Sequence, residues 1–178
     1  MYAVEVAETG GPEVLADVEK PQPSPGPGEV LIKAEAIGVN VVDTYFRSGL
    51  YPHELPFVLG EEVCGTVEAV GDGVTTLLLG ERVATADAIG AYAEYCIAPA
   101  DLVASVPKDI ASDVAAAAIL RGITTHFLIN SVYPVQQDGT VALHPGRRGW
   151  SHPDSVGDEP RGSCHHHSFH GGKGRTLA

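Results

Sequence analysis

The chain has little positive charge. It carries 11 Lys and Arg residues against 23 Asp and Glu residues, which gives a formal net charge of −12 over 178 residues. Binding to nucleic acid requires a cationic surface that neutralises phosphates. The charge balance therefore argues against a nucleic-acid partner. It is more simply that of a soluble protein whose negatively charged molecules repel one another.

Cysteine is scarce, and long apolar runs are absent. Cys64, Cys96 and Cys164 are the three cysteines, and no two have the spacing of a metal or redox motif. Cys64 and Cys96 fall in strand patterns and are expected to be small core residues. No stretch is long and apolar enough to cross a bilayer, and no basic leader follows Met1. We expect a reduced, cytoplasmic protein without a membrane segment.

The first part of the chain has a β-rich pattern. The hydrophobic fraction of 44% is sufficient for a core. Alternating and β-branched runs predict strands over residues 2–7, 29–37, 59–70, 82–85 and 91–98, with bends at Gly60 and Gly65. Proline-containing loops are expected at residues 21–28 and 51–57. Short strands with glycine turns at roughly ten-residue spacing favour a small barrel or sandwich.

The pattern changes after residue 110. Ser112 and Asp113 are plausible N-cap residues for a helical run over 114–120, and a second run follows Arg121-Gly122 and ends near Val132. An apolar strand is then expected over residues 140–143. Helix, turn and buried strand in this order begin a parallel α/β domain.

From Gly146 the sequence changes character again. Residues 146–178 have no apolar period, and Pro153 and Pro160 would break any helix, so we expect this tail to be disordered. An alternative interpretation is a metal-binding segment, because Cys164, the histidines at 165–167 and His170 are clustered donors.

Several segments in the first 145 residues resemble the zinc-independent quinone oxidoreductases of the medium-chain dehydrogenase/reductase superfamily. They are GGPEVL at 10–15, AIGVNVVDTY at 36–45, FRSG at 46–49, LGEEVCGTV at 59–67, GERV at 80–83 and LRGIT at 120–124. The resemblance implies a mainly β GroES-like (alcohol-dehydrogenase N-terminal-like) barrel over 1–110 and the start of a Rossmann α/β domain over 111–145. It also implies that NADPH and a quinone meet in the cleft between the two, where hydride passes to the quinone.

The resemblance also implies a site without metal. Asn40 stands where zinc-dependent relatives carry a cysteine ligand, and Glu61 stands where they carry a histidine. Zinc needs about four donors held tetrahedrally, usually histidine or thiolate. Glu61 and Glu62 alone cannot supply them.

By the same resemblance, Asn40, Asp43 and Tyr45 form the catalytic, cleft-facing set near the nicotinamide. Asn40, Tyr45, Arg121 and Thr124 are the implied cofactor contacts. An amide and a phenol can orient a carbonyl without losing a proton, which suits a reaction that needs mainly positioning.

Each assignment keeps a structural alternative. Asn40 and Asp43 could instead satisfy backbone groups in a turn, Tyr45 could be half-buried packing, and Arg121 could be a surface charge. His53, on its proline-flanked loop, is expected to be a surface residue.

The tail departs from the family. Family members follow the 140–143 strand with a glycine-rich turn that opens a helix and receives the pyrophosphate of the cofactor. When the tail is back-translated and the reading frame is shifted by one base, the codons of residues 146–150 can give the glycine-rich sequence AGGVG. The codons of the rest of the tail can give a helix and a strand. Trp150 before a serine codon that begins with T then forces glycine. In the shifted frame, the codon of each of the three consecutive histidines can give only isoleucine or threonine when the next codon begins with the base C.

We therefore hypothesise that residues 146–178 are an out-of-frame translation. The chain is then a truncated NADPH:quinone oxidoreductase with little NADPH affinity and negligible turnover. The alternatives are an enoyl or alkenal reductase of the same superfamily, and a non-catalytic GroES-like module with a metal-binding histidine-rich tail. The family often forms homodimers, an expectation that the lost cofactor domain weakens.

Overall fold

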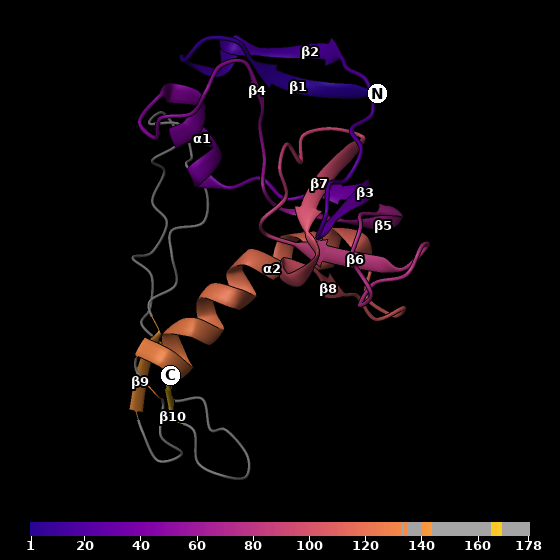
Figure 1. Cartoon of the computed structure of the whole chain (residues 1–178). Coiled ribbons are helices and arrows are strands. Elements are labelled where there is room, and N and C mark those ends of the chain that lie inside the picture. Colours follow the sequence, from indigo (N-terminus) through magenta and orange to yellow (C-terminus); the bar gives the residue numbers. More distant parts are fainter. Residues whose placement is uncertain (133, 135–139, 144–164, 169–178) are drawn as a thin grey trace. The chain divides into compact units, whose positions relative to one another are not determined.

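A computed structural model describes the backbone of residues 1–132, 134, 140–143 and 165–168, and the side chains of 1–132 and 134. The chain divides into two units, Met1–Thr124 and Thr125–Ala178. The first unit contains two antiparallel sheets and a short helix (Figure 1).

The larger sheet has five strands in the order β7-β3-β5-β6-β8, and the smaller has three in the order β2-β1-β4. The strands of the first unit are β1 (Tyr2–Val6), β2 (Leu15–Glu19), β3 (Glu29–Ile37), β4 (Phe57–Val58), β5 (Val63–Val70), β6 (Arg82–Thr85), β7 (Tyr95–Pro99) and β8 (Ala104–Ser105). Two 3-10 helices, η1 (Pro12–Val14) and η2 (Ala100–Leu102), and the helix α1 (Val41–Ser48) complete the β-rich region. The expected β-rich first part is confirmed.

The strand expected over residues 59–70 is shorter in the structure, where β5 begins at Val63. Gly60 has a φ of +96°, which takes the chain out of the extended conformation. The backbone of Leu59, Gly60 and Glu61 instead accepts hydrogen bonds from the amides of Tyr92, Ala91 and Ala88. The first residues of the predicted strand therefore pair with a loop and not with a strand of the sheet.

The main core lies within the larger sheet. It is built by aliphatic side chains of β3, β5 and β6 that are fully buried, including Val30, Ile32, Val63, Val67 and Val83. Each strand presents alternate residues to one face, so branched side chains at these positions pack against each other.

The two described cysteines are free and buried, as expected from their strand positions. Burial raises the pKa of the Cys96 thiol to about 12. Burial is also the main reason why the pKa of Cys64 is raised. Since the thiolate is the reactive form, both behave as core residues.

The helix α2 (Ser112–Phe127) is a single helix, which corrects the expectation of two runs separated at 121–122. Glycine in a helix interior costs only about 1 kcal/mol, so packing can override it. Ala115 and Ala116 of α2 are buried against Cys64 and Ala84, and this contact packs the first turns of the helix against the larger sheet.

Hydrogen bonds to residues of the larger sheet also hold the beginning of α2 in place. Arg82 donates hydrogen bonds from Nη2 to the carbonyl oxygen of Ile110 (2.8 Å) and to Ser112 Oγ (2.9 Å). Ser112 Oγ donates to Glu35 Oε2 at 2.5 Å. The hydrogen bond from Ser112, and after it the one from Thr66, lowers the pKa of the Glu35 carboxyl.

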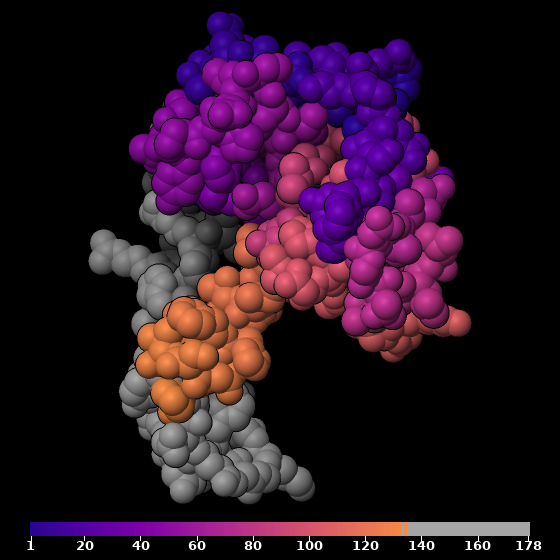
Figure 2. Space-filling model, in the orientation of Figure 1, coloured from indigo at the N-terminus to yellow at the C-terminus, as the bar shows by residue number. Residues whose placement is uncertain are grey.

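In the second unit, α2 ends and is followed by a π-helix (Leu128–Val132). Apolar side chains of these turns are exposed, among them Phe127, Leu128 and Ile129. The segment that carries them is coloured orange in Figure 2. In the part of the chain that the structure describes, no helix is both long and apolar enough to cross a membrane.

The expected strand over residues 140–143 is present as β9 (Thr140–Leu143). It pairs antiparallel with β10 (His165–Ser168), with His165 opposite Leu143 and Ser168 opposite Thr140. The other tail residues, including Cys164 and His170, lie outside the described residues. The expectations of disorder and of a frameshift over 146–178 therefore fall on residues of which only the β10 backbone is described.

Candidate functional site

The site is built on the N-terminus of α1, an element that the sequence did not predict. Asn40 precedes the helix in an extended conformation, and its backbone N–H donates to Asp43 Oδ2 at 2.8 Å. A side chain at this helical position that bonds back to the N-cap amide satisfies a backbone group that the helix leaves free. At the other end, Gly49 closes α1 with a φ of +77°.

Asp43 lies inside the protein and is only 3% exposed. Its Oδ2 atom also accepts a hydrogen bond of 2.8 Å from the Tyr92 hydroxyl. Its other oxygen, Oδ1, is buried with no hydrogen-bond partner among the described residues. Burial, and after it the bond to Asp43, raises the pKa of the Tyr92 phenol well above its usual range. This placement favours the alternative that Asp43 anchors α1 from within.

Glu62 joins Asn40 to α2. Its side chain is 0% exposed, and Oε2 accepts a hydrogen bond from Asn40 Nδ2 at 2.8 Å. Its Oε1 accepts the backbone N–H of Leu120 at 3.0 Å, and Arg121 Nη1 lies 3.9 Å from Oε2. A Cβ atom at Gly38 would collide with this carboxyl group, so only glycine fits there. The buried carboxylate thus holds the Asn40 amide in one orientation.

Tyr45 begins a row of aromatic rings. Its side chain is 36% exposed, and its ring meets that of Tyr51 edge-on at 5.3 Å between centroids. Tyr51 contacts Phe46 (5.7 Å), Phe46 contacts His53 (5.9 Å), and His53 contacts Phe57 (4.2 Å). His53 is exposed, as expected, but its ring is also part of this row.

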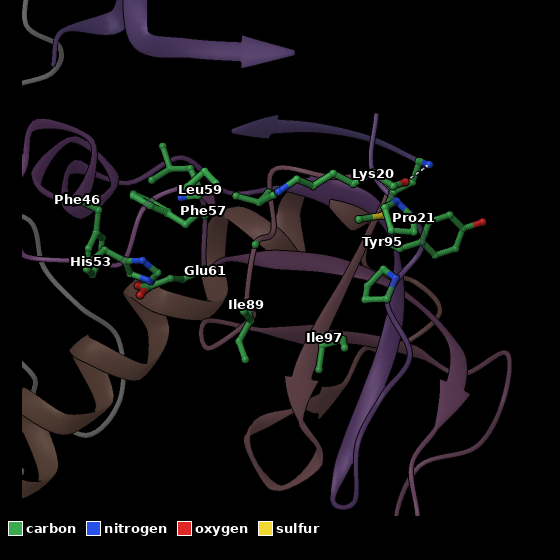
Figure 3. A pocket seen from close by; sticks show the side chains of 16 residues that line it. Lys20, Pro21, Phe46, His53, Phe57, Leu59, Glu61, Ile89, Tyr95 and Ile97 are labelled. Carbon is green, nitrogen blue, oxygen red and sulfur yellow. Dashed lines mark hydrogen bonds between the residues drawn. The ribbon is translucent and has the colours of Figure 1, made fainter. Parts of the chain in front are cut away.

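A cavity of about 590 Å³ lies at the far end of the aromatic row (Figure 3). Phe46, His53 and Phe57 line it together with Glu61, which is half-buried. Burial raises the pKa of the Glu61 carboxyl, and the charges of Asp43 and Asp87 raise it further. The His53 ring acts in the opposite direction and lowers it.

Arg121 and Thr124 lie on α2, one turn apart. Arg121 Nη1 donates to the carbonyl oxygen of Ala117 at 2.8 Å, and its side chain is 63% exposed. The Thr124 hydroxyl donates to the carbonyl oxygen of Leu120 at 2.9 Å. The structure thus brings Asn40 and Arg121 to the same buried carboxylate. The described contacts of Tyr45 and Thr124 are to other neighbours.

Two residues of the network, Glu62 and Tyr92, were missed by sequence reasoning. For Glu62 the sequence suggests only an insufficient zinc ligand, and Tyr92 falls in a predicted strand. Neither has a local signal, because each partner is far away in sequence, 22 residues for Asn40–Glu62 and 49 for Asp43–Tyr92. In the part of the chain that is described, no three His, Cys, Asp or Glu side chains gather as metal ligands would.

The chain is similar to a known domain family and to several solved structures. Residues 26–108 match the alcohol dehydrogenase GroES-like domain. A mycobacterial protein solved in complex with NADPH is 64% identical, with a TM-score of 0.75 over 77% of this chain and 43% of that chain. A quinone oxidoreductase of Escherichia coli complexed with NADPH is 41% identical, with a TM-score of 0.74 over 78% of this chain and 43% of that chain.

A probable quinone oxidoreductase of Schizosaccharomyces pombe is 41% identical over 147 residues, which are 82% of this chain and 45% of that protein. The chain therefore spans slightly less than half the length of the curated relatives that it matches.

Proposed function

We propose that this chain supplies the acceptor-binding side of an NADPH-dependent oxidoreductase site. The chain belongs to the quinone oxidoreductase family of the medium-chain dehydrogenase/reductase superfamily and spans its N-terminal part. The observation that carries the proposal is the bond from Asn40 Nδ2 to the buried Glu62 carboxylate. It fixes a partly exposed amide beside the N-terminus of α1, with the partly exposed phenol of Tyr45 on the same helix.

In this proposal Asn40 and Tyr45 bind and orient a quinone carbonyl. Both can donate a hydrogen bond to a carbonyl oxygen and neither has to lose a proton. Asp43 contributes by holding α1 in place through Asn40 and Tyr92. Hydride transfer depends mainly on positioning and electrostatics, so such groups are sufficient on the protein side.

The cofactor of the proposed site is NADPH, which supplies a hydride when it is bound. Asn40, Tyr45, Arg121 and Thr124 are the residues proposed to contact it. Arg121 and Thr124 are solvent-accessible, and a guanidinium with a nearby hydroxyl suits phosphate oxygens. We assign residues 1–110 to the GroES-like domain and 111–145 to the start of the nucleotide-binding domain.

We further propose that the 178 residues alone bind NADPH weakly and turn over negligibly. The support is the length comparison, since the NADPH-bound relatives are more than twice as long as the part that matches. The frameshift hypothesis is tested separately by reading the nucleotide sequence from codon 144 onward in all three frames. A cytoplasmic location stays a prediction, and so does the expectation that the loss of the cofactor domain weakens homodimer formation.

The acceptor-side proposal is tested by titrating the 178-residue chain with tetramethyl-1,4-benzoquinone and measuring equilibrium binding. We expect saturable binding that Asn40→Ala and Tyr45→Phe each weaken about fivefold, the loss of one hydrogen bond. Tyr2→Phe, at an exposed tyrosine on β1, is the matched control and should bind like the wild type. Unchanged binding in Asn40→Ala and Tyr45→Phe would contradict the proposed roles.

A further inference from the structure

We propose that the ring of the quinone acceptor binds in the cavity of Figure 3, with the Glu61 carboxyl donating a hydrogen bond to a ring carbonyl oxygen. The inference rests on the proposed function and adds to it a binding pocket and a residue that selects the ligand. All of the residues that line this cavity belong to the first unit.

The walls of the cavity suit a flat apolar ring. Phe57 and Leu59 contribute to one part of the lining, and Ile89 and Ile97 to another (Figure 3). The ring of His53 lies over that of Phe57, tilted by 35°. The volume of about 590 Å³ falls within the range of small-molecule sites, which are mostly apolar with a few polar groups.

The aromatic row connects this cavity to the candidate site. Tyr45 is at one end of the row, and Phe46 and His53 belong both to the row and to the cavity lining. Tyr45 and Phe46 are neighbours on α1, the helix that Asn40 caps. A quinone in the cavity would therefore lie against the same short helix that presents Asn40 and Tyr45.

Glu61 is the polar group that distinguishes a carbonyl ligand from a plain hydrocarbon. Its backbone is fixed because its carbonyl oxygen accepts the Ala88 N–H at 2.9 Å. A neutral carboxyl donates one hydrogen bond, whereas a carboxylate only accepts and would repel a carbonyl oxygen. Figure 3 shows its side chain near the His53 ring, at the cavity.

The charges around Glu61 favour the neutral form. The carboxylates of Asp43 in α1 and Asp87 after β6 raise its pKa in addition to burial, and the His53 ring opposes them. Lys20 also lines the cavity, but it is paired with Glu5. Quinone binding is therefore expected to weaken as the pH rises through the pKa of Glu61.

The test is a titration of the full chain with tetramethyl-1,4-benzoquinone, without NADPH, followed by amide and aromatic NMR shifts. Its ring is fully substituted, so it does not alkylate thiols. We expect saturable shifts at His53 and Phe57, and affinity about tenfold lower in mildly alkaline than in mildly acidic buffer. Glu61→Gln keeps a donor without a charge and should bind equally well in both buffers. Glu68→Gln, on the exposed side of β5, should retain the pH dependence.

A second variant tests the cavity by filling it. Ile89 lines the cavity and is 65% exposed, so Ile89→Trp should leave the core intact while its ring fills part of the cavity, and we expect about tenfold weaker binding. Binding that neither Glu61→Gln nor Ile89→Trp alters, with shifts confined to Asn40 and Tyr45, would overturn the pocket and leave the proposed function standing. A wild-type chain that binds no quinone in either buffer would overturn both.

Discussion

Glu62 is a buried carboxylate with a donor at each oxygen, Asn40 Nδ2 at one and the Leu120 N–H at the other. Glu62→Gln replaces one acceptor with an amide NH₂ that faces another donor. We expect the free energy of unfolding to fall by about 1–3 kcal/mol, because a buried donor loses its partner. Urea denaturation measures the change.

Glu68→Gln is the matched control for that experiment, since the same substitution on an exposed residue should stay within about 0.5 kcal/mol of the wild type. Equal stability of the Glu62 and Glu68 variants would show that the buried bonds to Asn40 and Leu120 contribute little.

Replacing Glu61 should change the free energy of unfolding in the opposite direction to replacing Glu62. Its folded-state pKa is raised, first by burial, so the folded chain holds this proton more tightly than the unfolded chain. Stability from this group is therefore lost as the pH rises above the ordinary carboxyl range. Glu61→Gln should be more stable than the wild type at neutral pH, by less than about 1 kcal/mol because the group is partly exposed.

That difference should shrink as the pH is lowered, because Glu61 becomes neutral in the wild type. Urea denaturation over a series of pH values measures it. A variant that is less stable than the wild type at neutral pH, or a gap that widens towards acid, would show that the ionised carboxylate is stabilised.

At the residue scale the sequence predicted only part of the site. The motif around Asn40 and Tyr45 was found through the resemblance. The role of Glu62 was not, because its partners come from Gly38–Asn40 and from α2, and only folding brings these together. His53 was assigned to the surface correctly, but its contact with Phe57 depends on the path of a proline-rich loop.

Among the elements, the turn at Gly60 positions the Glu61-Glu62 pair. Gly60 has a φ of +96°, and a Cβ there would collide with the Tyr92 ring. Gly60→Ala should therefore lower the free energy of unfolding by about 3 kcal/mol or more, from backbone strain and from displacement of Tyr92.

Gly73 provides the matched control. Its φ is +82°, but a Cβ there meets nothing within 4 Å, so Gly73→Ala should cost only about 1 kcal/mol. Urea denaturation of both variants separates the two contributions. Equal losses would mean that the space beside Tyr92 is not limiting.

Local patterns predicted the strands better than the helices. Residues 29–37 and 82–85 form strands with the expected bounds, because β-branched residues there are bounded by turns. The helix α1 was missed since it is short, and its Val41-Val42 start is a weak helix signal. For α2 the pattern predicts a break at Gly122, whereas the helix runs through it, because a single interior glycine costs only about 1 kcal/mol.

At the scale of the whole molecule, the β-rich part of the first unit has its own core, whereas α2 carries apolar side chains that stay exposed, such as Val114 and Ile123. The order of the motifs along the chain was sufficient to predict the family and the fold of this part. The acceptor could not be predicted in the same way, because the cavity that we assign to it is lined largely by loop residues such as His53 and Ile89.

The central claim is that these 178 residues supply the acceptor side of the site and that hydride transfer requires more than they provide. Steady-state oxidation of NADPH by the purified chain, over a range of tetramethyl-1,4-benzoquinone concentrations, tests it most directly. The account predicts a rate equal to that of the protein-free blank. A rate that saturates with both NADPH and quinone, and that Asn40→Ala abolishes, would contradict it.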